Sequence, residues 1–354
     1  MSIHVAVIGA TGLVGSLVLD VLAERKFPIK SLKLLASERS VGKKIAFQGR
    51  EYPVELAEPA AFEGVDLVFA CAGGATSAQL IPEAVKRGAV VIDKSSLYRL
   101  DPDVPLVVAG VNDEDLRKHQ GIIANPNCST SQLMPVLKAL DEAFGLKRVI
   151  VSTYQSVSGA GKAAIDELMS VTQEALNSPS RSSQTHHAFQ RPMGFNLIPQ
   201  IDQFVSFDEH EDASVENGYT KEETKLIRET RKILHLPNLA ITATAVRVPV
   251  FISHSESVTV ECLKPVSPEE ARRVLKLRED LVVSERPEDY PTPLDAAGKD
   301  PVYVGRIRRD TSCPETGLNL WVVGDNLRIG AALNAVRLAE YLLKQSLLSK
   351  PCPA

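Results

Sequence analysis

Short apolar runs and longer periodic stretches alternate along the N-terminal part of the chain. The apolar run from Ile3 to Gly9 is followed by a stretch from Leu13 to Ala23 in which apolar residues recur at helical spacing. Further apolar runs occupy residues 31–36, 65–71 and 89–93, and a helical pattern occupies residues 77–88. Alternating strands and helices predict an α/β unit with a Rossmann-type doubly wound parallel sheet.

The pattern changes from about residue 149. Longer runs with period-two character follow in RVIVSTYQSVSG, ITATAVRVPVFIS and SVTVECL, and they predict an α+β domain with a mainly antiparallel sheet. The polar, proline-containing stretches 177–191 and 287–299 are interpreted as surface loops or a dimer arm. Residues 325–348 carry Ala, Leu and Val at three- and four-residue spacing, which predicts one amphipathic C-terminal helix.

Composition and charge indicate a globular protein and argue against a nucleic-acid-binding one. A length of 354 residues is typical of about two domains, and 44% hydrophobic with 24% charged residues is typical of a globular protein. The formal net charge of -4 is too balanced for a nucleic-acid-binding surface, so a small-molecule partner is expected. Because no signal-peptide pattern and no apolar run of the ~20 residues needed for a membrane span are visible, a cytoplasmic protein is expected. Five cysteines, none at metal-ligand spacing, indicate reduced thiols and no metal site.

The segment VAVIGATGLVG places Gly9, Gly12 and Gly15 between the first strand and the first helix. Glycines here let the backbone turn tightly and approach a pyrophosphate, whose charge is stabilised by the free N–H groups of the helix start. Tight turns use glycine in any case, so a purely structural turn is the alternative. The position after the first strand favours a dinucleotide site.

The end of the second predicted strand indicates which dinucleotide is bound. Folds that bind NAD usually offer an acidic residue to the ribose at this point, but Ser37, Arg39 and Ser40 stand here. A guanidinium flanked by hydroxyl groups suits a 2′-phosphate, so NADP is favoured over NAD. The alternative is that these three residues only form a solvated loop.

The segment GIIANPNCSTSQLMPVLKAL runs from a strand into an apolar helix with Cys128 at the junction. The positive end of the helix dipole stabilises a thiolate, which makes Cys128 a candidate nucleophile. Asn127 and the first free N–H groups of the helix are placed to hold an oxyanion. Most free cysteines are small buried hydrophobic residues, a role that suits Cys71 better than Cys128.

Several segments together resemble the bacterial type of the aspartate-semialdehyde dehydrogenase family. The resemblance covers nearly the whole chain and rests on GATGLVG, ASERSVG, ANPNCST, YQSVSGAG, EETKLIRETRKIL, AVRVPVFISHSE and DNLRIGAALNAVRLAE, in this order. It implies NADPH-dependent reductive dephosphorylation of L-aspartyl-4-phosphate to L-aspartate-4-semialdehyde through a cysteine thioester. This reversible step belongs to the biosynthesis of lysine and diaminopimelate, threonine, methionine and isoleucine.

The resemblance also implies roles for individual residues. Cys128 matches the nucleophile and His254 the acid/base residue, while Gln155 matches the residue that positions the substrate. Arg247 matches the arginine that holds the α-carboxylate, a task suited to a planar fork of donors. Without the resemblance, a histidine near a strand end and a polar residue in a strand would be interpreted as structural.

Further matches concern the substrate ammonium and phosphate groups. Glu222 matches the residue that binds the ammonium group, and Lys225 and Arg99 match the phosphate ligands. Since Glu222 and Lys225 are three positions apart in a helical segment, a surface ion pair worth a few tenths of a kcal/mol is the alternative.

The remaining matches concern the cofactor, the domains and the assembly. The resemblance implies cofactor contacts from Gly9, Thr11, Gly12, Leu13, Val14, Gly15, Ser37, Arg39, Ser40, Ser158, Gly159 and Asn326. It implies an NADP-binding domain formed by residues 1–127 together with 325–354, a catalytic and dimerisation domain at 128–324, and a homodimer or dimer of dimers. The chain departs from the family pattern at Lys94, at Ala109–Gly110 and at Ile329, on the cofactor side.

Two other functions are considered. N-acetyl-γ-glutamyl-phosphate reductase has the same fold, cofactor and thioester chemistry, but its nucleophile segment usually reads like PGCYPT, which NPNCST does not resemble. A non-catalytic nucleotide-binding paralogue usually lacks the cysteine. The presence of Cys128, His254 and Arg247 together favours an enzyme.

Overall fold

The computed structural model describes residues 2–177, 188–205 and 218–348. The chain divides into two compact units, unit 1 with Met1–Asn127 and Gly330–Ala354, and unit 2 with Cys128–Ile329. Each unit is built around its own sheet.

The sheet of unit 1 has seven strands in the order β3-β4-β2-β1-β5-β6-β7. Its strands are β1 (Ile3–Ile8), β2 (Ile29–Ala36), β3 (Lys44–Phe47), β4 (Arg50–Leu56), β5 (Leu67–Ala70), β6 (Val90–Asp93) and β7 (Ile122–Ala124). Its α-helices are α1 (Leu13–Glu24), α2 (Gly74–Lys86) and α8 (Leu333–Lys344). All neighbouring strands pair in parallel except β3 and β4, which form an antiparallel hairpin.

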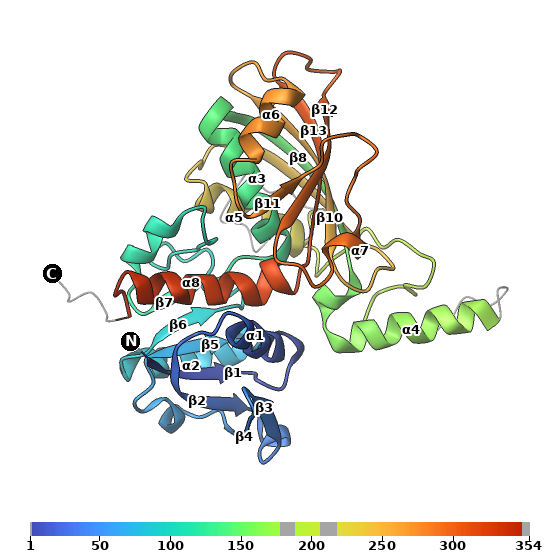
Figure 1. Ribbon diagram of the computed structural model, residues 1–354. Coiled ribbons are helices and arrows are strands. Elements are labelled where there is room, and N and C mark those ends of the chain that lie inside the picture. The colour runs from blue at the N-terminus through green and yellow to red at the C-terminus, as the bar shows by residue number, and fades with distance from the viewer. Residues whose placement is uncertain (1, 178–187, 206–217, 349–354) are drawn as a thin grey trace. The chain divides into compact units, whose positions relative to one another are not determined.

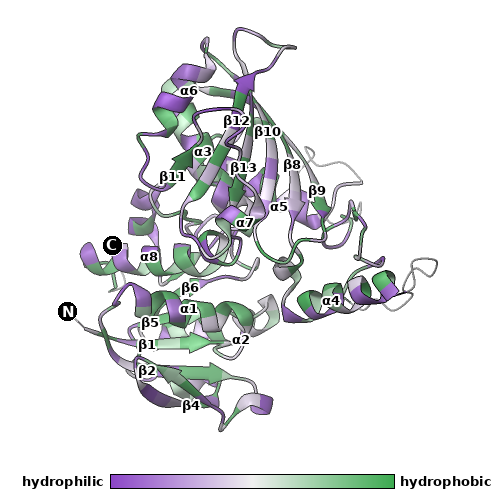
Figure 2. Ribbon diagram, turned by 45° about the vertical axis from the view of Figure 1, so that its right-hand side comes forward, coloured by the Kyte–Doolittle hydropathy of each residue, from purple (hydrophilic) through white to green (hydrophobic). Residues whose placement is uncertain are grey.

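The central strands β5 and β6 are short and mostly apolar, as expected where helices cover both faces of a parallel sheet, whereas β3 and β4 at the edge carry exposed polar residues. Strands β5 and β6 are buried at every position, and the apolar character of β1, β2 and β5 is visible in Figure 2. Helix α8 returns the end of the chain to α1, where Arg25 pairs with both carboxylate oxygens of Glu340 at 2.7 Å. The predicted doubly wound parallel sheet is confirmed.

The sheet of unit 2 has six strands in the order β11-β12-β13-β10-β8-β9. Its strands are β8 (Leu146–Gln155), β9 (Ala240–Arg247), β10 (His254–Cys262), β11 (Leu281–Val283), β12 (Val302–Arg309) and β13 (Gly317–Gly324). Its α-helices are α3 (Cys128–Phe144), α4 (Lys162–Asn177), α5 (Lys221–Ile233), α6 (Pro268–Leu275) and α7 (Pro293–Ala296).

The three central pairings of this sheet, β8–β10, β10–β13 and β12–β13, are antiparallel, as predicted. The outer pairings β8–β9 and β11–β12 are parallel. Helix α3 packs on β8, β10 and β13, with α5 and α6 beside it, so these helices cover one face of the sheet (Figure 1). The carboxyl ends of the parallel neighbours β8 and β9 therefore lie together, and they carry Gln155 and Arg247.

The C-terminal prediction is wrong in part. The stretch 325–348 is not one α-helix, since a π-helical segment at Arg328–Ala332 precedes α8. Asp325 Oδ1 accepts hydrogen bonds from the main-chain N–H groups of Leu327 and Arg328, which gives the chain a turn directly after β13. Asn326 therefore precedes the helix and lies, by its contacts, in unit 2.

Of the two predicted loops, one contains a short helix. The stretch 287–299 contains the one-turn helix α7, which begins with a capping box formed by Thr292 and Asp295. Of the stretch 177–191, residues 178–187 lie outside the described part of the chain. Within the described ranges, no helix is both long and apolar enough to cross a membrane.

Candidate active site

Cys128 is the first residue of α3, as predicted, and its side chain is partly exposed. Its Sγ lies 3.3 Å from Nε2 of His254, the first residue of β10. Two other thiols differ in environment, because burial raises the pKa of Cys71 to about 12 and that of Cys262 to about 11. The structure therefore brings Cys128 together with His254.

The hydrogen bonds of His254 determine which ring nitrogen carries the proton. The main-chain N–H of Ser156 lies 3.0 Å from Nδ1 and can only donate, so Nδ1 is the acceptor. The proton of the neutral ring is then on Nε2, the atom facing Cys128. The ring is completely buried, and burial together with the positive charge of Arg247 lowers its pKa to about 3. His254 is thus neutral near pH 7, with its proton directed at the sulfur.

A buried group of hydroxyl and amide side chains supports this ring. Ser156 Oγ lies 3.1 Å from His254 Nδ1, 3.0 Å from Ser158 Oγ and 3.1 Å from Asn326 Oδ1. The same Asn326 oxygen accepts a hydrogen bond from the main-chain N–H of Ser253 at 2.9 Å. Ser158 and Asn326, which the sequence predicts as cofactor contacts, lie within hydrogen-bond distance of Ser156 and so support the histidine through it.

Arg247 ends β9 with 7% of its surface exposed. Its Nη1 donates to the main-chain oxygen of Ser156 at 2.7 Å, and its guanidinium lies 6.0 Å from the ring centre of Phe189. A Cβ atom at Gly159 would lie 3.0 Å from Arg247 Nη1 and 3.4 Å from the His254 ring, so the lack of a side chain at Gly159 leaves room for both. Burial lowers the pKa of Arg247, and the negative charges of Glu222 and Cys128 oppose this shift.

Gln155 and Glu222 face each other across the site. Gln155 Nε2 donates to Glu222 Oε1 at 2.9 Å and makes a short contact with Ser129 Oγ. The neighbouring Glu223 points elsewhere, because it forms the capping box of α5 with Thr220. Glu222 and Lys225 are three positions apart in α5 and therefore face the same side of the helix.

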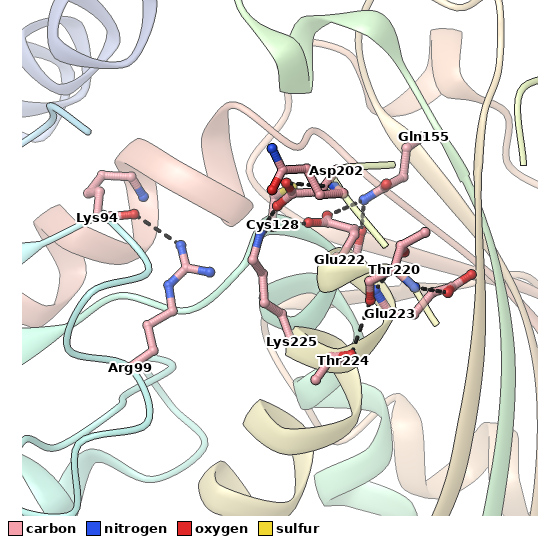
Figure 3. A network of polar contacts seen from close by, with 12 residues as sticks. Lys94, Arg99, Cys128, Gln155, Asp202, Thr220, Glu222, Glu223, Thr224 and Lys225 are labelled. Atoms are coloured by element: carbon pink, nitrogen blue, oxygen red, sulfur yellow. Dashed lines mark hydrogen bonds and ion pairs between the residues drawn. The ribbon is translucent and has the colours of Figure 1, made fainter. Parts of the chain in front are cut away.

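Lys225 makes two contacts with carboxylates, as Figure 3 shows. Its Nζ lies 2.7 Å from Asp202 Oδ2 and 3.4 Å from Glu222 Oε2. Burial acts to raise the pKa of Asp202, but the hydrogen bond and charge of Lys225 outweigh it, so this pKa is lowered. The Glu222–Lys225 pair is thus not a simple surface pair, because it belongs to a chain of contacts that includes Gln155.

The predicted dinucleotide turn lies in unit 1 at the carboxyl end of β1. Gly9 has a φ of +77°, and a Cβ atom there would lie 2.9 Å from the main-chain oxygen of Cys71. A Cβ atom at Gly15 would lie 2.2 Å from the main-chain oxygen of Gly9, so only glycine allows α1 to approach the strand this closely. Gly12 is the N-cap residue of α1 and has no side chain over the free N–H groups. This turn fits a pyrophosphate group.

The other predicted cofactor contacts of unit 1 surround this turn. Ser37 caps a short 3-10 helix (Glu38–Ser40) in which Arg39 is exposed, and Ser40 Oγ accepts a hydrogen bond from Thr11 Oγ1 at 3.3 Å. Leu13 and Val14, in the first turn of α1, are partly exposed. No acidic side chain ends β2, in agreement with the sequence.

Arg99 also lies in unit 1, with 9% of its surface exposed, and its Nη2 donates to the main-chain oxygen of Lys94 at 3.0 Å. The positions that depart from the family pattern have structural contacts within their own units. Lys94 Nζ donates to the main-chain oxygen of Ala331 at 2.8 Å, Ala109 N–H donates to Asn334 Oδ1 at 2.8 Å, and Ile329 is 2% exposed. Asn127 is 7% exposed and directly precedes Cys128.

Four polar residues near this site have no role predicted from the sequence: Ser156, Asp202, Gln132 and Glu256. A signal exists for two of them, since Gln132 follows Cys128 by four positions and Glu256 follows His254 by two, spacings that keep side chains on one face of a helix and a strand. Asp202 belongs to no motif and has no such partner at a fixed spacing.

Comparison with known proteins agrees with this geometry. The model of the "Semialdehyde dehydrogenase, NAD binding domain" matches residues 4–119, and that of the "Semialdehyde dehydrogenase, dimerisation domain" matches residues 137–329. Aspartate-semialdehyde dehydrogenase of Aquifex aeolicus is 49% identical, covering 98% of this chain and 100% of the relative, and that of Bacillus subtilis is 47% identical, covering 98% and 99%.

Solved structures give the same result. The crystal structure of aspartate semialdehyde dehydrogenase II from Vibrio cholerae, complexed with ASA, has a TM-score of 0.91 and 46% identity, covering 97% of this chain and 99% of that one. A probable aspartate-semialdehyde dehydrogenase from Pseudomonas aeruginosa has a TM-score of 0.87 and 33% identity, covering 98% and 100%. The chain belongs to the aspartate-semialdehyde dehydrogenase family.

Proposed function

We propose that this protein reduces L-aspartyl-4-phosphate to L-aspartate-4-semialdehyde, reversibly and with NADPH, through a thioester on Cys128. The observation that carries the proposal is the 3.3 Å contact between Cys128 Sγ and His254 Nε2 at the start of a helix. Membership in a family of oxidoreductases with a nicotinamide-binding domain agrees with it.

Cys128 is the nucleophile in this proposal. The helix start, the Nε2–H group of His254 and the charge of Arg247 all stabilise its thiolate. The sulfur attacks the acyl carbon, the carbon–oxygen bond to the phosphate breaks, and the electron pair leaves with the phosphate. The bound nicotinamide supplies a hydride to the thioester carbon when NADPH is present.

Collapse of the resulting tetrahedral alkoxide releases the aldehyde and returns the electron pair to the sulfur as thiolate. The departing phosphate takes up one proton from solvent, because the acyl-phosphate dianion would otherwise release PO4³⁻, and the hydride-transfer and collapse steps need no proton. His254 therefore acts by holding its Nε2 proton as a hydrogen-bond donor, first to the sulfur and then to the negative oxygen, with Asn127 beside it.

The polar residues of unit 2 supply the substrate contacts. The guanidinium of Arg247 suits the substrate carboxylate, and Glu222 suits the substrate ammonium group. Gln155 donates a hydrogen bond to Glu222, and in this proposal it also positions the reacting carbonyl group of the substrate. Lys225, and Arg99 of unit 1, are the proposed phosphate ligands. Burial strengthens each of these electrostatic contacts.

We also infer that the cofactor is NADP and that the protein is a homodimer or dimer of dimers in the cytoplasm. In this proposal the NADP-binding domain comprises residues 1–127 and 325–354 and the catalytic and dimerisation domain residues 128–324, bounds that differ from those of units 1 and 2 only at residues 325–329. The glycine turn binds the pyrophosphate in this proposal, and Arg39 and Ser40 bind the 2′-phosphate. The remaining proposed cofactor contacts come from Ser158, Gly159 and Asn326.

The decisive test is phosphate-dependent reduction of NADP, assayed with aspartate semialdehyde and with N-acetylglutamate semialdehyde. Activity with the first substrate is expected, and it should disappear in the absence of phosphate or arsenate. Activity only with N-acetylglutamate semialdehyde would assign the other reductase, and binding of NADP without turnover of either would indicate a non-catalytic paralogue.

A further inference from the structure

Glu256 is a completely buried carboxyl group beneath the candidate active site. It lies on β10 two residues after His254, so both side chains are on the same face of the strand. Its register neighbours are Thr153 on β8 and Val322 on β13, neither of which is charged. Neither carboxylate oxygen has a hydrogen-bond partner among the described protein atoms.

Gln132 links the helix that carries Cys128 to the strand that carries His254. It lies one helical turn after Cys128 on α3, and its Nε2 donates to the main-chain oxygen of His254 at 3.3 Å. Its Oε1 is buried and receives no donor from the described protein atoms. A Cβ atom at Gly324, opposite His254 on β13, would lie 2.9 Å from this oxygen, so the amide requires a glycine there.

The two unsatisfied groups complement each other only if Glu256 carries a proton. An ionised carboxylate has acceptors alone, as does the Gln132 oxygen, whereas a carboxylic acid has one O–H donor. Burial raises the pKa of Glu256 well above its ordinary value, and the nearby Gln132 amide only partly opposes this. A neutral acid is the form that avoids an unpaired buried charge.

We propose that Glu256 is a positioning residue: its protonated carboxyl group donates to Gln132 Oε1 and thereby holds Gln132 against the main-chain oxygen of His254. This contact ties the helix that carries Cys128 to the strand that carries His254, and it maintains the 3.3 Å approach of sulfur and Nε2. The inference rests on the proposed function only in assigning the reaction to this pair.

The experiment compares four variants of the full chain. Glu256→Gln keeps a donor and an acceptor in a neutral group of the same shape, whereas Glu256→Met and Gln132→Met each remove one side of the contact. The double variant Glu256→Met/Gln132→Met removes both. Glu261→Gln is the matched control, because Glu261 lies on the same strand but pairs with Lys147 on the surface.

Two readouts are measured for each variant: kcat and KM with aspartate semialdehyde, and the rate of alkylation of Cys128 by iodoacetamide. We expect Glu256→Gln and the control to stay within about twofold of wild type, because all buried polar groups keep a partner. Glu256→Met and Gln132→Met should each lower kcat and the alkylation rate about tenfold with KM unchanged. The double variant should lose no more than either single variant.

Three outcomes would overturn the proposal. The first is a lowered melting temperature with unchanged kcat and alkylation rate, which would make Glu256 purely structural. The second is an equal loss in Glu256→Gln and Glu256→Met, and the third is additive loss in the double variant. If Glu256→Met does not fold, Gln132→Met and Glu256→Gln decide between these results. If the wild type turns over neither semialdehyde, the proposed function fails, while the alkylation rates still test the contact.

Discussion

Two buried titratable groups on β10 should give unit 2 opposite responses to pH. The pKa of His254 falls from 6.5 to about 3 on folding, so below pH 6.5 the unfolded chain binds a proton that the folded chain does not. Stability is therefore fully present above pH 6.5 and is lost as pH falls towards 3. The pKa of Glu256 is raised well above 4.5, so its contribution is present below pH 4.5 and is lost as pH rises.

The magnitude follows from the linkage slope of about 1.4 kcal/mol per pH unit for one group. Between pH 6.5 and 5.0 His254 changes the unfolding free energy by ~2 kcal/mol, and Glu256 changes it with the opposite sign. His254→Asn leaves only Glu256, so its stability relative to wild type should rise on acidification. Glu256→Gln removes the Glu256 contribution, so its stability relative to wild type should fall on acidification.

The assay is thermal unfolding followed by fluorescence of Trp321, the single tryptophan of the chain, which lies on β13 of unit 2. A change of ~2 kcal/mol should move the melting temperature by roughly 4–8 °C in a domain of this size. Subtracting wild type at each pH removes the other titrating groups, and His119, whose pKa is also lowered by burial, lies in unit 1. A variant-minus-wild-type difference that is the same at pH 5.0 and 6.5 for both variants would refute this reasoning.

Four further substitutions test the site. Cys128→Ala should abolish turnover while melting temperature and NADP binding stay near wild type; labelling by an alkylating substrate analogue mainly at another cysteine would contradict this role. Arg247→Lys should cost ~2–4 kcal/mol in kcat/KM, and an equal loss with an aldehyde that lacks the α-carboxylate would argue against a carboxylate clamp. Arg39→Ala should weaken NADP about ten- to a hundredfold and leave NAD unchanged, as titration of both cofactors would show, and equal losses would indicate that Arg39 only supports its loop. Asp202→Asn should lower the KM for phosphate about fivefold by removing the carboxylate that competes for Lys225, an effect of roughly 1 kcal/mol for a half-exposed pair; a raised KM would show that Asp202 instead orients the lysine.

Local patterns in the sequence determined the elements and the first candidate residues. The spacing of apolar positions predicts the strand from Ile3 and the helix from Leu13, because periods of 2 and 3.6 residues are properties of the local backbone. The placement of Cys128 at a strand-to-helix junction is equally local. The C-terminal helix was predicted with its start too early, because a turn stabilised by Asp325 is not visible in hydrophobic periodicity.

The tertiary structure alone decided which residues meet in the site and where the proton of His254 lies. Cys128 meets a histidine 126 positions away, and the proton on that histidine is directed by the main-chain N–H of Ser156, 98 positions away. Likewise, Lys225 contacts Asp202, which is 23 positions away and outside any motif. Hydrogen bonds across such separations depend on how strands pair and helices pack, so the sequence determined which groups are present, and the fold determined their protonation and their partners.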